Sequence, residues 1–312
     1  MRKLKYITLF LITATLFSCQ KDPMSEITDG KWNKERNIIN LSFDGQVGTT
    51  TINRVGDVAT INFTYNTSNS ANFSAIKINA LELSYQATAS VKLGETLNFE
   101  NASKTATISV TPANGEPLNW VVKLTPFTET LLGVWDITSL YVYGGTGPEY
   151  GGAGIIKMSD KPWCWPAAEG PSAEQDNFLT FTLTGISADG NTYGKVVNNA
   201  GADGKYANFI YIAKTPNVDV NNFYRAIPKG EGTWSRNYAT GMVIFTFPDG
   251  TTRQGLFASP GKVDLGNGKS RTLINNAFTF TLNGTDDWGN IYNDFDKFVK
   301  RPRVYWVDIK KR

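Results

Sequence analysis

Apolar and polar residues alternate strictly in several short stretches between residues 37 and 127. In the stretch VATINFTY the apolar positions are Val58, Ile61, Phe63 and Tyr65, and polar residues separate the last three. Alternation with a period of two residues is typical of a β-strand that buries one face. We therefore expect strands in this part of the chain.

Three further stretches show the same alternation. Residues 75–85, AIKINALELSY, change phase at Ala80, whereas residues 105–111, TATISVT, and 119–125, NWVVKLT, keep their phase. The NGEP sequence at 114–117 is a turn signal between the last two stretches. Several short strands separated by turns predict that this domain is a small β-sandwich.

Strand-like runs also recur from Leu131 to the C-terminus, separated by turn sequences such as ADGN and FPDGTT. Residues 242–257, MVIFTFPDGTTRQGLF, predict a hairpin that closes on Asp-Gly. The best helix candidate, DWGNIYNDFDKFV at 287–299, is short. We therefore predict a second all-β domain over residues 131–312, a larger β-sandwich, jelly roll or barrel, after a boundary within residues 126–139.

The first residues have the features of an exported protein. The basic segment RKLK precedes the uncharged run YITLFLITATLF, which is shorter than the roughly 20 residues that a membrane-spanning helix needs. The run ends in LFSC, which resembles the lipobox of bacterial lipoproteins. This resemblance implies a lipoprotein signal peptide over residues 1–18 and attachment of lipid to Cys19. A polar tether over residues 19–36 follows.

Charge and cysteine content narrow the functional classes. Three of the 31 basic residues and none of the 28 acidic residues precede Cys19, so the rest of the chain carries 28 of each. This balance disfavours a nucleic-acid partner, which usually requires a basic surface. If Cys19 carries lipid, Cys164 is a lone thiol, and we interpret it as a small buried apolar residue.

The chain contains no histidine. This excludes Ser-His-Asp and Cys-His nucleophile systems and removes the commonest ligand of transition metals. An enzyme built on this chain would use paired carboxylates, as glycoside hydrolases do. The second domain offers Glu149, Glu169, Glu174, Asp176 and Glu231. Because the sequence gives no distance between them, we name no catalytic residue.

The segment DKPWCWPAAEGP, residues 160–171, places Trp163 and Trp165 on either side of Cys164. Its prolines exclude a central strand and a helix interior, so we expect a long loop. An indole offers a flat apolar face with one hydrogen-bond donor, which suits stacking against the C–H face of a sugar ring. Alternatively, the loop folds back and the indoles plug one end of the domain.

A second aromatic turn, NGTDDWGNIYND, sets Trp288 and Tyr292 among acidic and amide side chains. We add Trp288 to the predicted ligand-binding tryptophans. The oxygens of Asp286, Asp287 and Asn290 also form a candidate calcium site. Their spacing departs from that of the EF-hand loop, so a solvated turn is the alternative. No other cofactor is expected.

Residues 37–126, which end in ATISVTPANGEPLNWVVKLTPF, resemble the immunoglobulin-like N-terminal domains of Bacteroidota surface lipoproteins. In that family the domain is a β-sandwich spacer between the membrane and a larger domain. The GVW sequence at 133–135 is similar to the Gly-x-Trp of the first lipocalin strand, and we expect Trp135 to cap the core. As a whole the chain resembles the glycan-binding lipoproteins of Bacteroidota polysaccharide-utilisation systems.

This resemblance implies a surface-exposed lipoprotein of the outer membrane that captures oligo- or polysaccharide for a neighbouring outer-membrane transporter. Its partners would be a glycan and, through the lipid, the membrane. Two alternatives stay open: a carboxylate-based glycoside hydrolase or lyase, and a cell-surface adhesin or structural protein. We favour binding over catalysis. The sequence does not identify the glycan, the oligomeric state or the membrane leaflet.

Overall fold

A computed structural model describes Met24 and residues 32–67 and 72–312. The predicted signal peptide, the lipidation site Cys19 and most of the predicted tether lie outside the described residues. The described residues fold into two compact units. Most of the first unit ends at Pro126, and most of the second begins at Phe127. Within the described residues, no helix is both long enough and apolar enough to cross a membrane.

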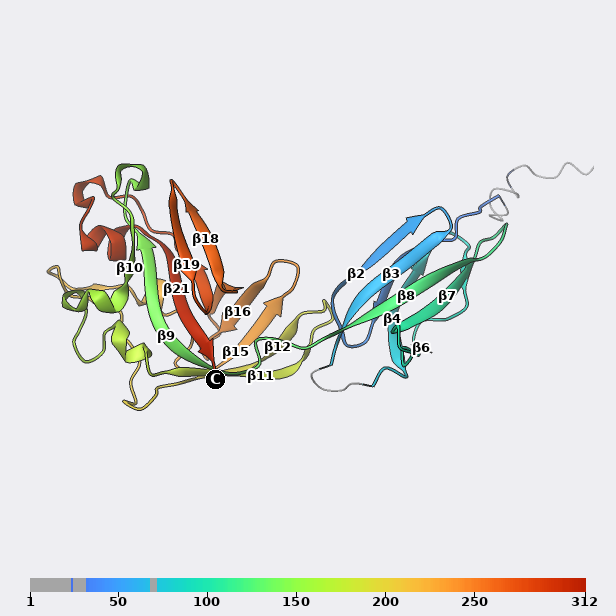
Figure 1. Cartoon of the computed structure of the whole chain (residues 1–312), viewed down its shortest axis with the longest axis horizontal. Helices are drawn as coiled ribbons and strands as arrows, with labels where there is room; N and C mark the ends of the chain where they lie inside the picture. Colours follow the sequence, from blue (N-terminus) through green and yellow to red (C-terminus); the bar gives the residue numbers. More distant parts are fainter. Residues whose placement is uncertain (1–23, 25–31, 68–71) are drawn as a thin grey trace, which may run out of the picture. The chain divides into compact units, whose positions relative to one another are not determined.

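The first unit is a β-sandwich (Figure 1). One sheet has the order β1 (Ile38–Phe43), β4 (Ile76–Leu83), β6 (Thr96–Leu97). The other has the order β2 (Gln46–Val55), β3 (Val58–Asn66), β8 (Leu118–Phe127), β7 (Thr105–Thr111), β5 (Thr88–Ala89). Side chains from both sheets share one core, in which the rings of Phe43 and Phe63 stack with centroids 4.2 Å apart.

Alternation decides which side chains of the sandwich strands point inward. In β8, Trp120, Val122 and Leu124 are buried, and the residues between them are exposed. Val58, the first residue of β3, is out of phase with Ile61 and Phe63 and is 70% exposed. The small apolar Ala59 takes the inward position instead, because Ala59, and not Val58, is in phase with the buried residues that follow.

The phase change that the sequence shows at Ala80 is a β-bulge. Ser42 of β1 pairs with Ala80 of β4, but the next residue, Phe43, pairs with Ile78. One residue of β4 is therefore left without a direct partner on β1, which shifts the inward phase by one position.

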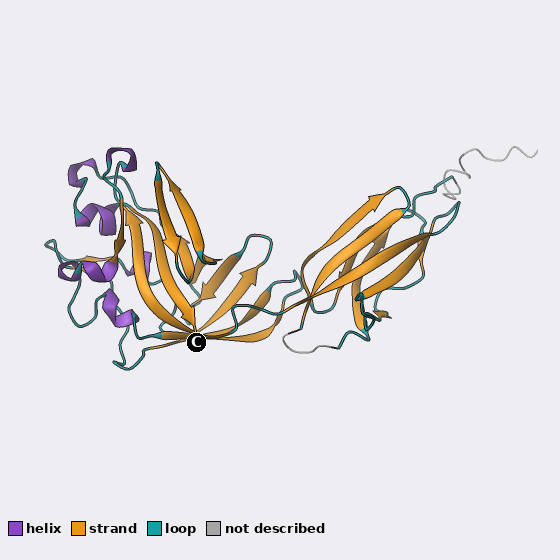
Figure 2. Cartoon of the chain, viewed as in Figure 1, coloured by secondary structure: helices purple, strands orange, loops and turns teal. Residues whose placement is uncertain are grey.

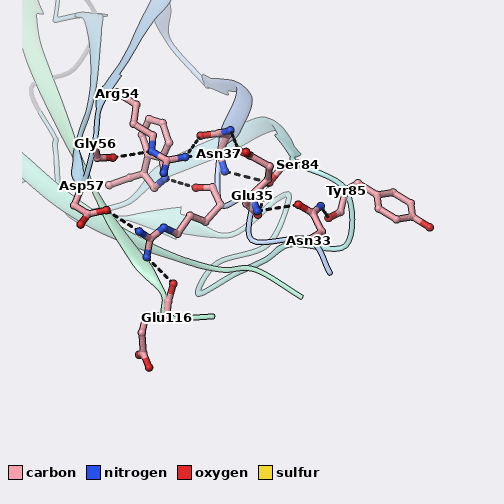
Figure 3. Close-up of polar contacts among 11 residues, drawn as sticks. Asn33, Glu35, Asn37, Arg54, Gly56, Asp57, Ser84, Tyr85 and Glu116 are labelled. Atoms are coloured by element: carbon pink, nitrogen blue, oxygen red, sulfur yellow. Dashed lines mark hydrogen bonds and ion pairs between the residues drawn. The ribbon is translucent and has the colours of Figure 1, made fainter. Parts of the chain in front are cut away.

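The chain enters the sandwich through a segment that side-chain contacts hold in place (Figure 3). Asn33 donates to the carbonyl oxygen of Tyr85 at 2.8 Å. Arg36 forms an ion pair with Asp57 at 2.6 Å. The indole N–H of the buried Trp120 donates to the carbonyl oxygen of Arg36 at 3.0 Å. These contacts fix the segment that precedes β1 on the sandwich.

The second unit is a closed antiparallel barrel of eight strands. Each barrel strand pairs with the next barrel strand along the chain, and the last pairs with the first. The strands are β9 (Gly133–Gly144), β11 (Phe178–Ile186), β12 (Thr192–Asn199), β15 (Gly230–Asn237), β16 (Met242–Thr246), β17 (Thr252–Ala258), β20 (Asn276–Thr281) and β21 (Pro302–Lys311). The protein is therefore all-β, as predicted. Of the three predicted folds of the second domain, the barrel is the one observed.

Short elements connect or cover the barrel strands (Figure 2). The additional strands are β10 (Gly154–Lys157), β13 (Ile210–Tyr211), β14 (Val218–Asp219), β18 (Gly261–Gly266) and β19 (Lys269–Leu273). The helical turns are η1 (Pro148–Tyr150), η2 (Met158–Asp160), η3 (Pro162–Cys164), η4 (Pro171–Glu174), α3 (Asn221–Tyr224), η5 (Trp288–Asn290) and η6 (Asp296–Lys300). The predicted hairpin is β16–β17, and the helix candidate supplies η5 and η6.

Aromatic side chains fill the barrel interior. Phe181, Phe245 and Phe278 belong to one buried cluster. Trp135 caps this core as expected: it is 4% exposed, and its ring lies edge-on to Phe257 with centroids 5.6 Å apart. A cavity in the interior measures only about 10 Å³, room for about one water molecule. This cavity is too small for a ligand larger than a water molecule.

Candidate functional site

The two tryptophans of the predicted loop take opposite positions. Trp165 is 2% exposed and packs against four core aromatic rings, of which Phe298 is nearest with centroids 5.3 Å apart. Its indole offers no face at the surface. For Trp165, the alternative in which the loop folds back and buries the indole is therefore correct. Trp163, two residues earlier and inside η3, is 59% exposed.

Trp163 is linked to a second loop through Lys161. The Nζ atom of Lys161 lies 5.1 Å from the centroid of the Trp163 ring and 3.1 Å from Oδ2 of Asp294. The Sγ of Cys164 lies 4.0 Å from the same oxygen, and this thiol is buried, as interpreted from the sequence. The loop that carries Trp163 therefore contacts the loop that carries Asp294.

Three exposed rings gather on two neighbouring loops, and we call Tyr150, Trp288 and Tyr292 the aromatic surface. Their exposed fractions are 65%, 57% and 59%. The rings of Tyr150 and Trp288 lie edge to face with centroids 6.0 Å apart, and the Tyr292 hydroxyl donates to the Tyr150 carbonyl oxygen at 3.3 Å. In Figure 1 these loops are the green and red helical turns above β9 and β10.

A buried hydrogen-bond network joins the two loops. Asp296 is 0% exposed, and its carboxylate accepts the backbone amide of Thr146 at 2.6 Å and the Thr146 hydroxyl at 2.9 Å. The hydroxyl oxygen of Thr146 in turn accepts the amide of Asp287 at 2.7 Å. Thr146 thus holds the Tyr150 loop against both ends of the segment that carries Trp288.

Each of the two loops contains a residue with a positive φ. Tyr292 has a φ of +75°, in the left-handed region that bulky residues rarely adopt. Gly147 has a φ of +61°, and a Cβ there would lie 3.1 Å from the Trp288 ring. Strained residues that their surroundings hold in place cluster at ligand sites. The glycine-rich loop therefore lets the two chain segments approach closely and fixes the rings.

The candidate calcium residues are engaged by other side chains. One oxygen of Asp286 lies 2.9 Å from Nε of Arg301 and 3.2 Å from Nη2 of Arg303. Asp287 accepts the side-chain amide of Asn290 at 2.7 Å. Positive charge beside Asp286 opposes a bound cation. The described ranges also hold no cluster of three or more His, Cys, Asp or Glu residues that could bind a metal.

Two of the carboxylates considered for catalysis are held by structural contacts. Glu174 is 3% exposed, lies 2.7 Å from Nη1 of Arg225, and accepts the amide of Ala207 at 3.0 Å. Asp176 accepts the backbone amide of Ala202 at 2.8 Å. These contacts join residues 174–176 to the segments that carry Ala202, Ala207 and Arg225.

The structure therefore groups Trp288 with Tyr150 and Tyr292, places Trp163 on a contacting loop, and removes Trp165 from the surface. Sequence reasoning missed Tyr150. The available signal was an aromatic residue inside a glycine-rich loop, YGGTGPEYGG, where neither strand nor helix would bury it.

The fold and the site define an all-β protein with a β-sandwich, an eight-stranded barrel and aromatic rings on the barrel's loops. No family model matches the chain, and no curated protein matches it. A solved structure from Bacteroides fragilis, named provisionally as a secreted protein, is 18% identical with a TM-score of 0.23, covering 30% of this chain and 96% of its own. Another, from Bacteroides thetaiotaomicron and named provisionally as a glycoside hydrolase, is 11% identical with a TM-score of 0.26, covering 90% and 84%. At these TM-scores neither likeness supports a conclusion about activity.

Proposed function

We propose that this protein binds an oligo- or polysaccharide at the cell envelope by stacking sugar rings on exposed aromatic side chains. The observation that carries the proposal is the contact between Tyr150 and Trp288, two rings that are each more than half exposed yet lie edge to face. Contiguous exposed apolar groups mark interaction surfaces, whereas single exposed apolar side chains are normal. Tyr292 extends the same surface.

Polar groups beside the rings match the rim of hydroxyls on a sugar. Asn290 and Asn293 lie in the same loop, and the Asn293 side-chain amide donates to the Asn290 side-chain oxygen at 3.3 Å. Asp294, the next residue of this loop, lies 3.1 Å from Nζ of Lys161, which is on the Trp163 loop. A chain of several sugars could therefore contact the aromatic surface first and Trp163 further along.

The anchoring part of the proposal rests on the sequence. The LFSC sequence supports lipid attachment at Cys19, which would hold the protein on the outer membrane and expose it at the surface. A neighbouring outer-membrane transporter would then receive the captured glycan. Expression of the full chain in a Gram-negative host tests the anchor: the wild type should sediment with membranes, and Cys19→Ser should not. Equal sedimentation of both would remove the anchor from the proposal.

Affinity electrophoresis through gels that contain single polysaccharides tests the site. We expect Trp288→Ala to weaken retention on the bound glycan by about tenfold or more, equivalent to ~1.4 kcal/mol or more, because buried aromatic contacts dominate binding energies. Tyr150→Ala and Trp163→Ala should weaken retention by smaller amounts. Tyr85→Ala, which removes a ring of the sandwich that is 60% exposed, is the matched control.

Unchanged retention of Trp288→Ala on every glycan that the wild type binds would overturn the site. Release of new reducing ends during incubation with the same polysaccharides would replace binding with catalysis. Binding of a protein partner without retention on any glycan would favour the adhesin alternative.

A further inference from the structure

Four large apolar side chains are exposed near the ends of the sandwich strands. Val55 and Val58 flank the two-residue turn between β2 and β3 and are 81% and 70% exposed. Trp32 precedes β1, Tyr85 follows β4, and each is 60% exposed. In Figure 3 the ring of Tyr85 points away from the polar contacts around it. Grouped exposed apolar side chains mark interaction surfaces, so the relative positions of these four decide their meaning.

Contacts of the segment before β1 place these side chains at one end of the sandwich. Asn33, the residue after the exposed tryptophan, donates to the carbonyl oxygen of Tyr85 at 2.8 Å. Arg36 forms its ion pair with Asp57, inside the turn that the two valines flank. Arg36 also donates to the carbonyl oxygen of Glu116, between β7 and β8, at 2.8 Å. The segment therefore touches three connections at the same end, and we call this end, with its four exposed apolar side chains, the apolar end.

The charges at the apolar end balance one another. Residues 32–37, 54–58 and 112–117 carry three basic and three acidic side chains, namely Lys34, Arg36, Arg54, Glu35, Asp57 and Glu116. In addition to the Arg36–Asp57 pair, Arg54 lies 3.8 Å from a carboxylate oxygen of Glu35. Attraction of anionic lipids requires an excess of basic residues, so a partner of this end would be held by its apolar and aromatic side chains.

The proposed lipid attachment site would hold the apolar end close to a membrane. Thirteen positions separate Cys19 from Trp32, and an extended chain of that length spans at most roughly 45 Å. Because the chain enters the sandwich at the apolar end, this is the end that a lipid at Cys19 would keep nearest the bilayer. Tryptophan and tyrosine are enriched at membrane interfaces, where the ring contacts lipid and its polar group stays hydrated.

We propose that the apolar end docks on the surface of a lipid bilayer, with its aromatic rings and valines in the headgroup region. The inference rests on the anchoring part of the proposed function. Four side chains alone would bind a bilayer weakly, but a lipid at Cys19 would keep the bilayer at a high effective concentration. Docking would then orient the sandwich on the membrane that anchors it.

Vesicles with an artificial tether test the inference independently of Cys19. The chain from Gln20 onward carries an N-terminal hexahistidine tag and is bound to phosphatidylcholine vesicles that contain a nickel-chelating lipid. Since the chain has no histidine of its own, the tag supplies the nickel ligands. The tether therefore enters at the same end of the sandwich as the proposed lipid would.

A nitrobenzoxadiazole probe reports contact with the bilayer. It is attached at Val58→Cys or, as the matched control, at Leu93→Cys, each in a Cys164→Ala background. Leu93 is also exposed, at 64%. The next residue, Gly94, donates its amide to the carbonyl oxygen of Ile78 near the start of β4, whereas the apolar end lies beyond the end of β4.

Lipids that carry a nitroxide quench the probe where it contacts the bilayer. We expect quenching at position 58 to exceed quenching at position 93 at least threefold. Replacing Trp32 and Tyr85 together by serine should lower quenching at position 58 to the control level. Val55→Asp, which places a charge on the most exposed of the four positions, should do the same. Val121→Ser removes a partly exposed apolar side chain from within β8 and should leave the quenching unchanged.

Three results would overturn the inference. They are equal quenching at the two probe positions, quenching at position 58 that survives both sets of changes, and a probe response that rises with protein concentration without vesicles. The last result would assign the apolar end to a second copy of the chain. Because the tag supplies the tether, these results do not depend on Cys19. Equal sedimentation of the wild type and Cys19→Ser would remove the native anchor, whereas equal quenching would remove the docking surface.

Discussion

Asp296 accepts two hydrogen bonds from Thr146, one from the backbone amide and one from the hydroxyl, although 150 positions separate them in the sequence. Neither side chain exposes any surface. The pair fixes the two loops of the aromatic surface before any ligand arrives. Ordering side chains in advance removes part of the entropic cost of binding.

Replacing Thr146 by valine should loosen the aromatic surface. The change deletes a hydroxyl that bonds both Asp296 and the amide of Asp287. Leaving buried polar groups unpaired should lower the free energy of unfolding by about 1–3 kcal/mol. Amide hydrogen exchange of residues 147–152 should accelerate, and retention on the bound glycan should fall several-fold. Thr146→Ser keeps the hydroxyl and should behave like the wild type; equal glycan retention by valine and serine variants would reject this positioning role.

The two tryptophans of DKPWCWP should differ sharply in their contribution to stability. Trp165→Ala removes a ring from the barrel core and should lower the free energy of unfolding by about 3–5 kcal/mol. Trp163→Ala alters an exposed side chain and should change it by about 0.5 kcal/mol or less. Urea denaturation of the full chain, followed through the barrel's transition, measures both. Similar losses from the two variants would contradict the assignment of Trp165 to the core.

Protonation of Glu129 should make the barrel less stable in acid. Burial raises the pKa of its carboxyl, but hydrogen bonds from Tyr238, Thr192 and the amide of Leu131, together with the charge of Arg236, lower the pKa below its ordinary value of 4.5. The unfolded state therefore binds the proton more readily, so this contribution is complete above about pH 4.5 and is lost as the pH falls through the native pKa.

Urea denaturation between pH 7 and pH 3 measures this effect. Glu129→Gln should lower stability at pH 7 by about 3–5 kcal/mol, because it leaves Arg236 without its buried partner. The difference between wild type and variant should shrink as the pH falls. A constant difference across the range would show that Glu129 does not lose its charge in this window.

Cys164 should be unreactive while the barrel is folded. Burial, assisted by the negative charge of Asp294, raises the pKa of its thiol to about 11. The thiolate is the reactive form, so at pH 8 very little is available. Iodoacetamide should label the Cys19→Ser protein only after denaturation in guanidinium. Rapid stoichiometric labelling of the native protein would show that the thiol is accessible.

Much of the strand content could be predicted from local pattern. The alternation in β8, the phase change at Ala80 and the Asp-Gly turn between β16 and β17 all lie within a few residues of chain. Such a pattern states that one face is buried, but it names no partner strand. The sequence therefore left sandwich, jelly roll and barrel open for the second domain.

The positions of the candidate site residues depend on contacts between residues that are far apart in the sequence. Trp163 and Trp165 have almost the same sequence surroundings, yet one lies at the surface and the other in the core. Their difference comes from rings such as Phe298 that only the folded chain brings near. Tyr150 meets Trp288 because Thr146 and Asp296 join their loops, a contact that no short motif records.

By itself, the sequence determined that the protein is all-β, that it lacks histidine chemistry, and where most strands begin and turn. These are properties of composition and of residues close along the chain. Only the tertiary structure decided that the barrel closes through β21 and β9, and that Arg271 reaches Asp308, 37 positions away. Closure and this ion pair depend on which strand edges and side chains meet in space, and period-two alternation carries no information about that.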